Sequence, residues 1–167
     1  MKNTALFASL LLLVAGISQA ETTVTLEGVH NCCKSCTNGI VKAGTSVKDV
    51  TVTAEGKTVT VVAKTKMGAK KAVEAIMEAG YYGTPSETAE TASAPKTEKK
   101  LTDVTVTGAH LCCQKCVNAM TDAVKAVPGV KEYDIQNKAK SFTVKGDFTE
   151  ADLIASMNKA GFHGTVK

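Results

Sequence analysis

The sequence contains no arginine and no tryptophan, and only 4% of its 167 residues are aromatic. All twenty of its basic residues are therefore lysines, and its formal net charge is only +4. Arginine is the side chain best suited to recognising phosphates and bases, and aromatic rings are the surfaces on which single-stranded nucleic acids stack. These absences argue against a nucleic-acid partner. The hydrophobic content of 44% and the charged content of 22% are typical of a globular chain.

Long hydrophobic runs are also scarce. The single long one, from Ala5 to Ile17, is shorter than the ~20 residues needed to span a bilayer. Lys2 precedes it, and the small residues of Ser18-Gln19-Ala20 follow it, which is the pattern of a secretory signal peptide. We therefore expect residues 1–20 to be a signal peptide. The mature protein would begin at Glu21, contain no membrane span, and be periplasmic or secreted.

All six cysteines lie in two copies of one short motif. The first copy is His30-Asn31-Cys32-Cys33-Lys34-Ser35-Cys36, and the second is His110-Leu111-Cys112-Cys113-Gln114-Lys115-Cys116. Each copy follows a short alternating apolar run and precedes a helical pattern, so we expect the thiols at a strand-to-helix turn. The exposed N–H groups of a helix start favour the thiolate, which is the form that binds soft metals or attacks disulfides.

The cysteine motifs belong to a longer internal repeat, in which residues 24–84 resemble residues 104–165. In each copy the apolar spacing predicts the order strand, helix, strand, strand, helix, strand. This order is that of an α+β sandwich of the ferredoxin-like kind. We therefore expect two tandem ferredoxin-like βαββαβ domains, over residues 21–85 and 101–167. Residues 86–100, rich in Ser and Thr, would form a flexible linker.

Several local features are expected within these domains. Glu55-Gly56 is a plausible hairpin turn, because glycine tolerates a positive φ. Thr149 should cap the helix that follows it. Met77 and Met157 occupy equivalent helix positions and are interpreted as core residues rather than metal ligands. Tyr81-Tyr82 is expected to begin the last strand of the first domain.

The βαββαβ order, the cysteine pair at the first strand-to-helix loop and the closing Ala-Gly-Tyr/Phe run resemble the heavy-metal-associated domain family. This family includes copper chaperones, the N-terminal modules of copper-exporting ATPases and a periplasmic mercury-binding protein. The resemblance covers each repeat almost whole. It implies that two thiolates on an exposed loop hold Cu(I) or another soft ion. The ion would pass by ligand exchange to a partner, such as a metal-transporting membrane protein or another metal acceptor.

The family motif reads Gly-Met-x-Cys-x-x-Cys, and this sequence departs from it by an extra cysteine and by a histidine near the methionine position. One alignment makes Cys33 the first ligand of the first loop, and the other makes it Cys32. Two thiolates suit Cu(I), whereas three thiolates and an imidazole suit Zn(II); Hg(II) is a further soft candidate. The candidate metal ligands are Cys33, Cys36, Cys113, Cys116, Cys32, Cys112, His30 and His110.

The extra cysteine of each loop either binds metal or faces the core, and the histidine either binds metal or hydrogen-bonds to the backbone. By the resemblance, Tyr81 and Phe162 should shield the loops. His163 is a further candidate ligand with no counterpart in the first domain.

The sequence therefore predicts a metal-binding protein rather than an enzyme. It would act as an exported carrier or sequestering buffer, with Cu(I) as the preferred ion and Zn(II) or Hg(II) as alternatives. Two other functions compete with this one. A Cys-x-x-Cys pair at a helix start also fits a thiol–disulfide oxidoreductase. Six cysteines in an oxidising compartment also fit a structural module held by disulfides.

Overall fold

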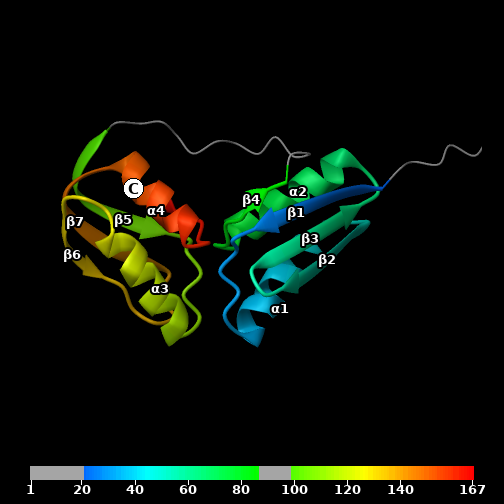
Figure 1. Cartoon of the computed structure of the whole chain (residues 1–167), viewed down its shortest axis with the longest axis horizontal. Helices are drawn as coiled ribbons and strands as arrows, with labels where there is room; N and C mark the ends of the chain where they lie inside the picture. Colours follow the sequence, from blue (N-terminus) through cyan, green and yellow to red (C-terminus); the bar gives the residue numbers. More distant parts are fainter. Residues whose placement is uncertain (1–20, 87–98) are drawn as a thin grey trace, which may run out of the picture.

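The computed structural model describes residues 21–86 and 99–167, which form two modules (Figure 1). The predicted signal peptide lies outside the described residues, and so do residues 87–98 of the predicted linker (86–100); Lys100, at its end, already belongs to a strand of the second module. The described residues on either side of this stretch are each hydrogen-bonded to a module. The N–H of Ser86 donates to the carbonyl of Thr25 (2.7 Å), and the carbonyl of Lys99 accepts from the N–H of Glu150 (3.1 Å). Within the described ranges, no helix has the length and apolar character that a bilayer crossing requires.

The first module has the predicted order of elements. They are β1 (Thr22–Glu27), α1 (Lys34–Gly44), β2 (Val50–Glu55), β3 (Thr58–Ala63), α2 (Lys66–Glu78) and β4 (Thr84–Pro85). The strands form one sheet in the order β2-β3-β1-β4, and every neighbouring pair is antiparallel. This is the ferredoxin-like arrangement. The predicted hairpin turn is confirmed, since Gly56 connects β2 to β3 with a φ of 56°.

The second module repeats this order. Its elements are β5 (Lys100–Thr107), α3 (Gln114–Lys125), β6 (Val130–Asp134), β7 (Ser141–Thr149), α4 (Glu150–Lys159) and β8 (Thr165–Val166). The sheet order is β6-β7-β5-β8, again antiparallel throughout. The Thr149 cap is confirmed, because its hydroxyl accepts from the N–H of Asp152 at 3.1 Å. The α+β fold class with two tandem ferredoxin-like sandwiches is therefore confirmed.

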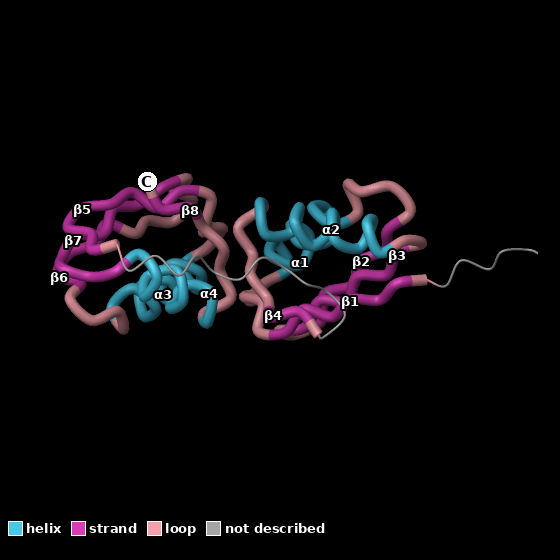
Figure 2. Tube along the Cα trace, turned by 90° about the horizontal axis from the view of Figure 1, so that it is seen from above, coloured by secondary structure: helices cyan, strands magenta, loops and turns pink. Residues whose placement is uncertain are grey.

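Each module is a two-layer sandwich with its helices on one face of its sheet (Figure 2). The period-two pattern of β1 places Val24 and Leu26 in the core, and helical spacing places Ile40 and Ile76 opposite them. Met157 is also buried and Met77 packs against the core, as the sequence predicted. In Figure 2 the helical layers of the two modules lie on opposite sides, so one module is turned over relative to the other.

The segment after α2 differs from the prediction. Tyr81 does not begin β4; it forms an isolated antiparallel bridge with Phe162 of the other module. The last strand of the first module starts only at Thr84. Tyr81 and Phe162 are among the largest fully buried side chains, at 1% and 0% exposure. The Ala-Gly-Tyr/Phe runs therefore connect the two modules instead of extending their sheets.

A matched difference between the modules surrounds these two aromatic residues. A Cβ on Gly39 of α1 would collide with the Tyr81 hydroxyl. The equivalent position in α3 is Ala119, and there the aromatic residue is Phe162, which has no hydroxyl. The Tyr81 hydroxyl is buried without a hydrogen-bond partner in the described structure. Glycine at position 39 thus accommodates the hydroxyl.

This pairing predicts a non-additive double mutant. Gly39→Ala alone should lower the free energy of unfolding of the first module by about 1–3 kcal/mol, because its methyl group overpacks the site. In a Tyr81→Phe background the same change should be neutral or stabilise by up to ~1 kcal/mol, because alanine is the better helix former. Chemical denaturation of the four variants, followed by circular dichroism, measures the coupling. Equal effects of Gly39→Ala in both backgrounds would reject the contact.

Candidate metal centre

The cysteine loops join the first strand of each module to its first helix. Cys33 occupies the N-cap position of α1 in an extended conformation, with φ −161° and ψ 166°. Cys113 occupies the same position of α3, with φ −153° and ψ 171°. The third cysteine of each motif, Cys36 or Cys116, lies in the first helical turn and is fully buried. The predicted strand-to-helix placement of the thiols is confirmed.

Each loop is supported by the β-hairpin of its own module. The N–H of Val29 donates to the carbonyl of Lys57 (3.0 Å), and the N–H of Lys138 donates to the carbonyl of Leu111 (2.7 Å). In the first loop the Thr37 hydroxyl also donates to the Asn31 side-chain oxygen at 2.9 Å. These bonds fix the loops before any ion binds.

The two loops face each other at the junction of the modules (Figure 1). Backbone hydrogen bonds cross this junction. The carbonyl of Gly161 accepts from the N–H groups of His30 (3.2 Å) and Tyr82 (3.0 Å). The carbonyl of Gly80 accepts from the N–H of His163 (3.1 Å). These contacts are related by an approximate two-fold symmetry, because Tyr82 and His163 are equivalent residues of the repeat.

The histidines of the loops stack on aromatic residues of the opposite module. His30 stacks on Phe162, and His110 packs on Tyr81, each with ring centroids 4.4 Å apart. Such pairs contribute roughly 0.5–1.5 kcal/mol beyond the burial of their area. The predicted shielding role of Tyr81 and Phe162 therefore takes a crossed form, in which each residue covers the loop of the other module.

Two glycines allow this close approach. A Cβ on Gly80 would collide with the backbone of Gly108 and His110, and a Cβ on Gly161 would collide with the backbone of Gly28 and His30. Both glycines also have positive φ values, of 93° and 86°. Any other residue would therefore push the modules apart.

The closed junction brings all six cysteines together as free thiols. Nine pairs of Sγ atoms lie 3.6–3.8 Å apart. Five of these pairs join one loop to the other, such as Cys36 with Cys112 at 3.6 Å. The sequence predicted one site in each module. The structure instead places both sets of ligands in a single cluster.

In the described structure, four groups of three side chains could each hold a metal ion, and their ligand atoms are thiols and one imidazole. Within each cluster the ligand atoms lie within 4.8 Å of one another. The clusters are His30-Cys32-Cys116, Cys32-Cys33-Cys113, Cys33-Cys36-Cys112 and Cys112-Cys113-Cys116. Three of the four combine residues of both loops. The donor set is soft throughout, which suits ions such as Cu(I) and excludes a dedicated site for Mg²⁺ or Ca²⁺.

Comparison with known proteins identifies the second module. Residues 104–163 match the family model of the heavy-metal-associated domain. The second module therefore matches the heavy-metal-associated domain over most of its length. The first module has the same fold and the same loop, and the match covers the second module alone. The curated proteins contain no match to the chain.

Solved structures similar to the chain include two of CopA from Bacillus subtilis. The first is of its N-terminal soluble domains, at 17% sequence identity and a TM-score of 0.32, with 89% of this chain and 95% of that chain covered. The second is of the water-soluble region of this P-type ATPase, at 16% identity and a TM-score of 0.30, with 89% of this chain and 93% of that chain covered. The first two RRM domains of yeast poly(U)-binding protein Pub1 are also similar, at 9% identity and a TM-score of 0.27, with 87% of this chain and 98% of that chain covered. Likenesses this low carry no argument about function.

The thiols of the two loops differ in acidity. The backbone N–H of Cys116 at the start of α3 lowers the pKa of Cys113 to about 6, although no capping hydrogen bond of normal length forms. The equivalent N–H of Cys36 also lowers the pKa of Cys33. Burial raises the pKa values of Cys32, Cys112 and Cys116. Metal must therefore displace protons from the buried thiols, while Cys113 is already a thiolate at neutral pH.

The loop histidines are neutral at physiological pH. Burial lowers the pKa of His30, with a further contribution from Lys57, and burial likewise lowers the pKa of His110. The Nε2 atoms of both rings are buried without a hydrogen-bond partner in the described structure. His30 lies within reach of Cys32 and Cys116, whereas His110 belongs to none of the clusters above. His163, the further candidate, contacts the other module through its backbone and also belongs to none of them.

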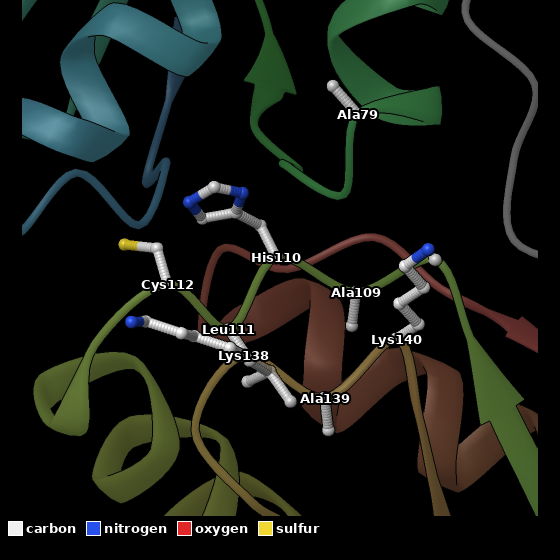
Figure 3. A pocket seen from close by; sticks show the side chains of 9 residues that line it. Ala79, Ala109, His110, Leu111, Cys112, Lys138, Ala139 and Lys140 are labelled. Atoms are coloured by element: carbon white, nitrogen blue, oxygen red, sulfur yellow. The ribbon is translucent and has the colours of Figure 1, made fainter.

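An open hollow lies beside the second loop (Figure 3). It is lined by His110 and Cys112 of that loop, by Lys138 and Lys140 of the neighbouring hairpin, and by Ala79 of the first module. Cys112 is therefore the thiol of the cluster that this hollow exposes, and two lysines line the same hollow.

The glycine contacts predict how the junction can be opened. A Gly80→Ala/Gly161→Ala chain should separate its modules, whereas Gly28→Ala/Gly108→Ala should not. All four glycines have a positive φ, so an alanine at any of them costs the same backbone strain of ~1–2 kcal/mol, and this strain does not distinguish the two variants. A Cβ at Gly28 or Gly108, however, meets no atom within 4 Å. Small-angle X-ray scattering should show a larger radius of gyration for the first pair only. An unchanged radius for Gly80→Ala/Gly161→Ala would contradict the junction.

The acidity of Cys113 predicts its reactivity. In the metal-free, reduced protein, iodoacetamide should modify Cys113 first, with a rate that rises through a midpoint near pH 6, because only the thiolate reacts. Cys112 and Cys116 should react slowly until a higher pH. Peptide mapping by mass spectrometry gives the order, with Cys113→Ser as the control for assignment. Modification of Cys116 before Cys113 would refute the assignment.

Proposed function

We propose that the protein is an exported carrier or buffer for soft metal ions, with Cu(I) as its principal cargo. A single observation supports this most strongly: six free thiols of two loops meet at one place and form a donor set without oxygen ligands. The heavy-metal-associated domain over residues 104–163 supports metal binding independently. The protein has no enzymatic role in this proposal.

The mechanism is ligand exchange. The neutral imidazole of His30 and the thiolates of both loops provide several donors at similar distances, so an ion can move between them without a free intermediate. The hollow beside Cys112 gives an acceptor protein access to one thiol of the cluster. A metal-transporting membrane protein or another metal acceptor would receive the ion there. Location in the periplasm or outside the cell follows from the predicted signal peptide.

Zn(II) and Hg(II) are the alternative ions. Zn(II) would require a tetrahedral set such as three thiols and an imidazole. His30 lies near Cys32 and Cys116, which supplies three such donors. Hg(II) shares the preference of Cu(I) for sulfur. Competition among the three ions decides between them.

Thiol–disulfide exchange is a second candidate, and the acidity of Cys113 favours it. A thiolate with a pKa of about 6 lies 3.7 Å from the thiol of Cys116, with which it could form a disulfide after attacking a substrate. This activity would need no metal.

A chelator competition tests the proposal. Under anaerobic, reducing conditions the chain should withdraw Cu(I) from a chromophoric chelator. Replacing Cys33, Cys36, Cys113 and Cys116 with Ser should weaken binding by more than the ~10–100-fold typical of a lost outer-sphere contact. Met67→Leu is the matched control, since Met67 is an exposed sulfur, at 62% exposure, outside the cluster. Undiminished binding by the serine variant would reject the ligand assignment. Catalytic reduction of a model disulfide by the metal-free protein would favour the oxidoreductase instead.

A further inference from the structure

The six Sγ atoms form an octahedron. Nine of its twelve edges are the pairs 3.6–3.8 Å apart. The other three edges, which are Cys32–Cys33, Cys33–Cys113 and Cys112–Cys113, are within 4.8 Å. The three remaining pairs are not among these contacts and take the place of opposite vertices: Cys32 with Cys112, Cys33 with Cys116, and Cys36 with Cys113. An octahedron has triangular faces but no four mutually adjacent vertices. The thiols therefore offer three-coordinate sites and no preformed tetrahedral site of four sulfurs.

Four alternate faces of this octahedron use every sulfur twice. Three of them are clusters of thiols already described, and the fourth is closed by the contacts of Cys32, Cys36 and Cys116 at 3.7–3.8 Å. The faces are Cys32-Cys33-Cys113, Cys33-Cys36-Cys112, Cys112-Cys113-Cys116 and Cys32-Cys36-Cys116. Any two of these faces share a single sulfur. One ion in each face would therefore be held by three sulfurs, and each sulfur would bridge two ions.

The distances fit this coordination. With a metal–sulfur bond of about 2.3 Å, two sulfurs are about 4.6 Å apart around a linear ion and about 4.0 Å apart around a trigonal one. The observed contacts of 3.6–3.8 Å lie well below the linear value and near the trigonal one. Four sulfurs around a tetrahedral ion would be about 3.8 Å apart, but no four of these thiols are mutually adjacent. Among soft ions, Cu(I) accepts three thiolates and shares them with neighbouring ions.

We propose that the six thiolates hold one polynuclear Cu(I)–thiolate cluster of about four ions, shared by both modules, in place of one ion per module. This inference rests on the proposed function, because it requires Cu(I) as cargo. Formation of the cluster releases to solvent the protons of those thiols that are not yet ionised, and it transfers no electrons. About four copper charges against six thiolates leave a net charge of about −2. Lys57, whose charge acts on His30, and Lys138, which lines the same hollow as Cys112, can compensate part of this charge.

The cluster requires the closed junction. Three of the four faces combine sulfurs of both loops, and one face belongs to the second loop alone. A first ion therefore stabilises the closed junction, which keeps the other faces assembled for the next ions. Binding is cooperative, and the chain changes from metal-free to fully loaded with few intermediates.

Native mass spectrometry tests this directly. Cu(I) is added stepwise, as its acetonitrile complex, to the reduced full chain without oxygen. The expected spectrum contains the monomeric metal-free chain and a monomeric species with about four ions, and little of the species with one or two. Saturation at two ions, with the one-ion species abundant midway, would overturn the shared cluster and leave the proposed function in place. No binding of Cu(I) would remove both.

Three double variants test whether the capacity and the cooperativity come from the shared cluster. Cys32→Ser/Cys112→Ser keeps both Cys-x-x-Cys pairs, and its capacity should fall from about four ions to about two. An unchanged capacity would overturn the cluster. Gly80→Ala/Gly161→Ala keeps all six thiols but opens the junction, and it should lose cooperativity. Gly28→Ala/Gly108→Ala should bind as the unmodified chain does. Cooperative loading of about four ions by the opened variant would also contradict the shared cluster.

Discussion

The packing of each module's closing glycine against the other module's cysteine loop is the constraint on which the site depends. Gly80 and Gly161 leave no space for a side chain, and their carbonyls accept hydrogen bonds across the junction. The crossed stacks of His30 on Phe162 and of His110 on Tyr81 add to this contact. Because the same segment of the repeat makes the contact from both sides, the two loops meet symmetrically. The thiols then have one common location instead of two separate ones.

Gathering six thiols at one place has an electrostatic cost, which makes three of them weaker acids. Burial opposes ionisation of Cys32, Cys112 and Cys116, so the pKa values of these thiols are raised. A monovalent cation removes that cost, because it replaces a proton on the sulfur and allows neighbouring thiolates to remain close. Closure of the modules and capture of metal are therefore linked. An ion that binds only the closed arrangement stabilises it by mass action.

The fold of each module could be predicted from sequence, because period-two and helical spacings, the Gly56 turn and the Thr149 cap are local signals. The position of the cysteines at a helix start followed from the same signals. The meeting of the loops could not be predicted, since a repeat shows that two segments are equivalent but not that they face each other. For the same reason Tyr81 was wrongly placed in a strand. Its bridge partner is Phe162 of the other module. One signal of side-chain contact was present in the sequence, because Gly39 and Tyr81 of the first repeat are both replaced in the second, by Ala119 and Phe162. The periodicity of apolar residues does not detect such paired differences.

X-ray absorption at the copper K edge tests the central claim most directly, because it reports the neighbours of the metal rather than its amount. Both loops contribute sulfurs to every Cu(I) site but one in this account. The fully loaded chain should therefore show about three sulfur neighbours per copper and a second copper at short distance. About two sulfurs per copper, with no copper neighbour, would show that each loop binds its own ion and would contradict the account.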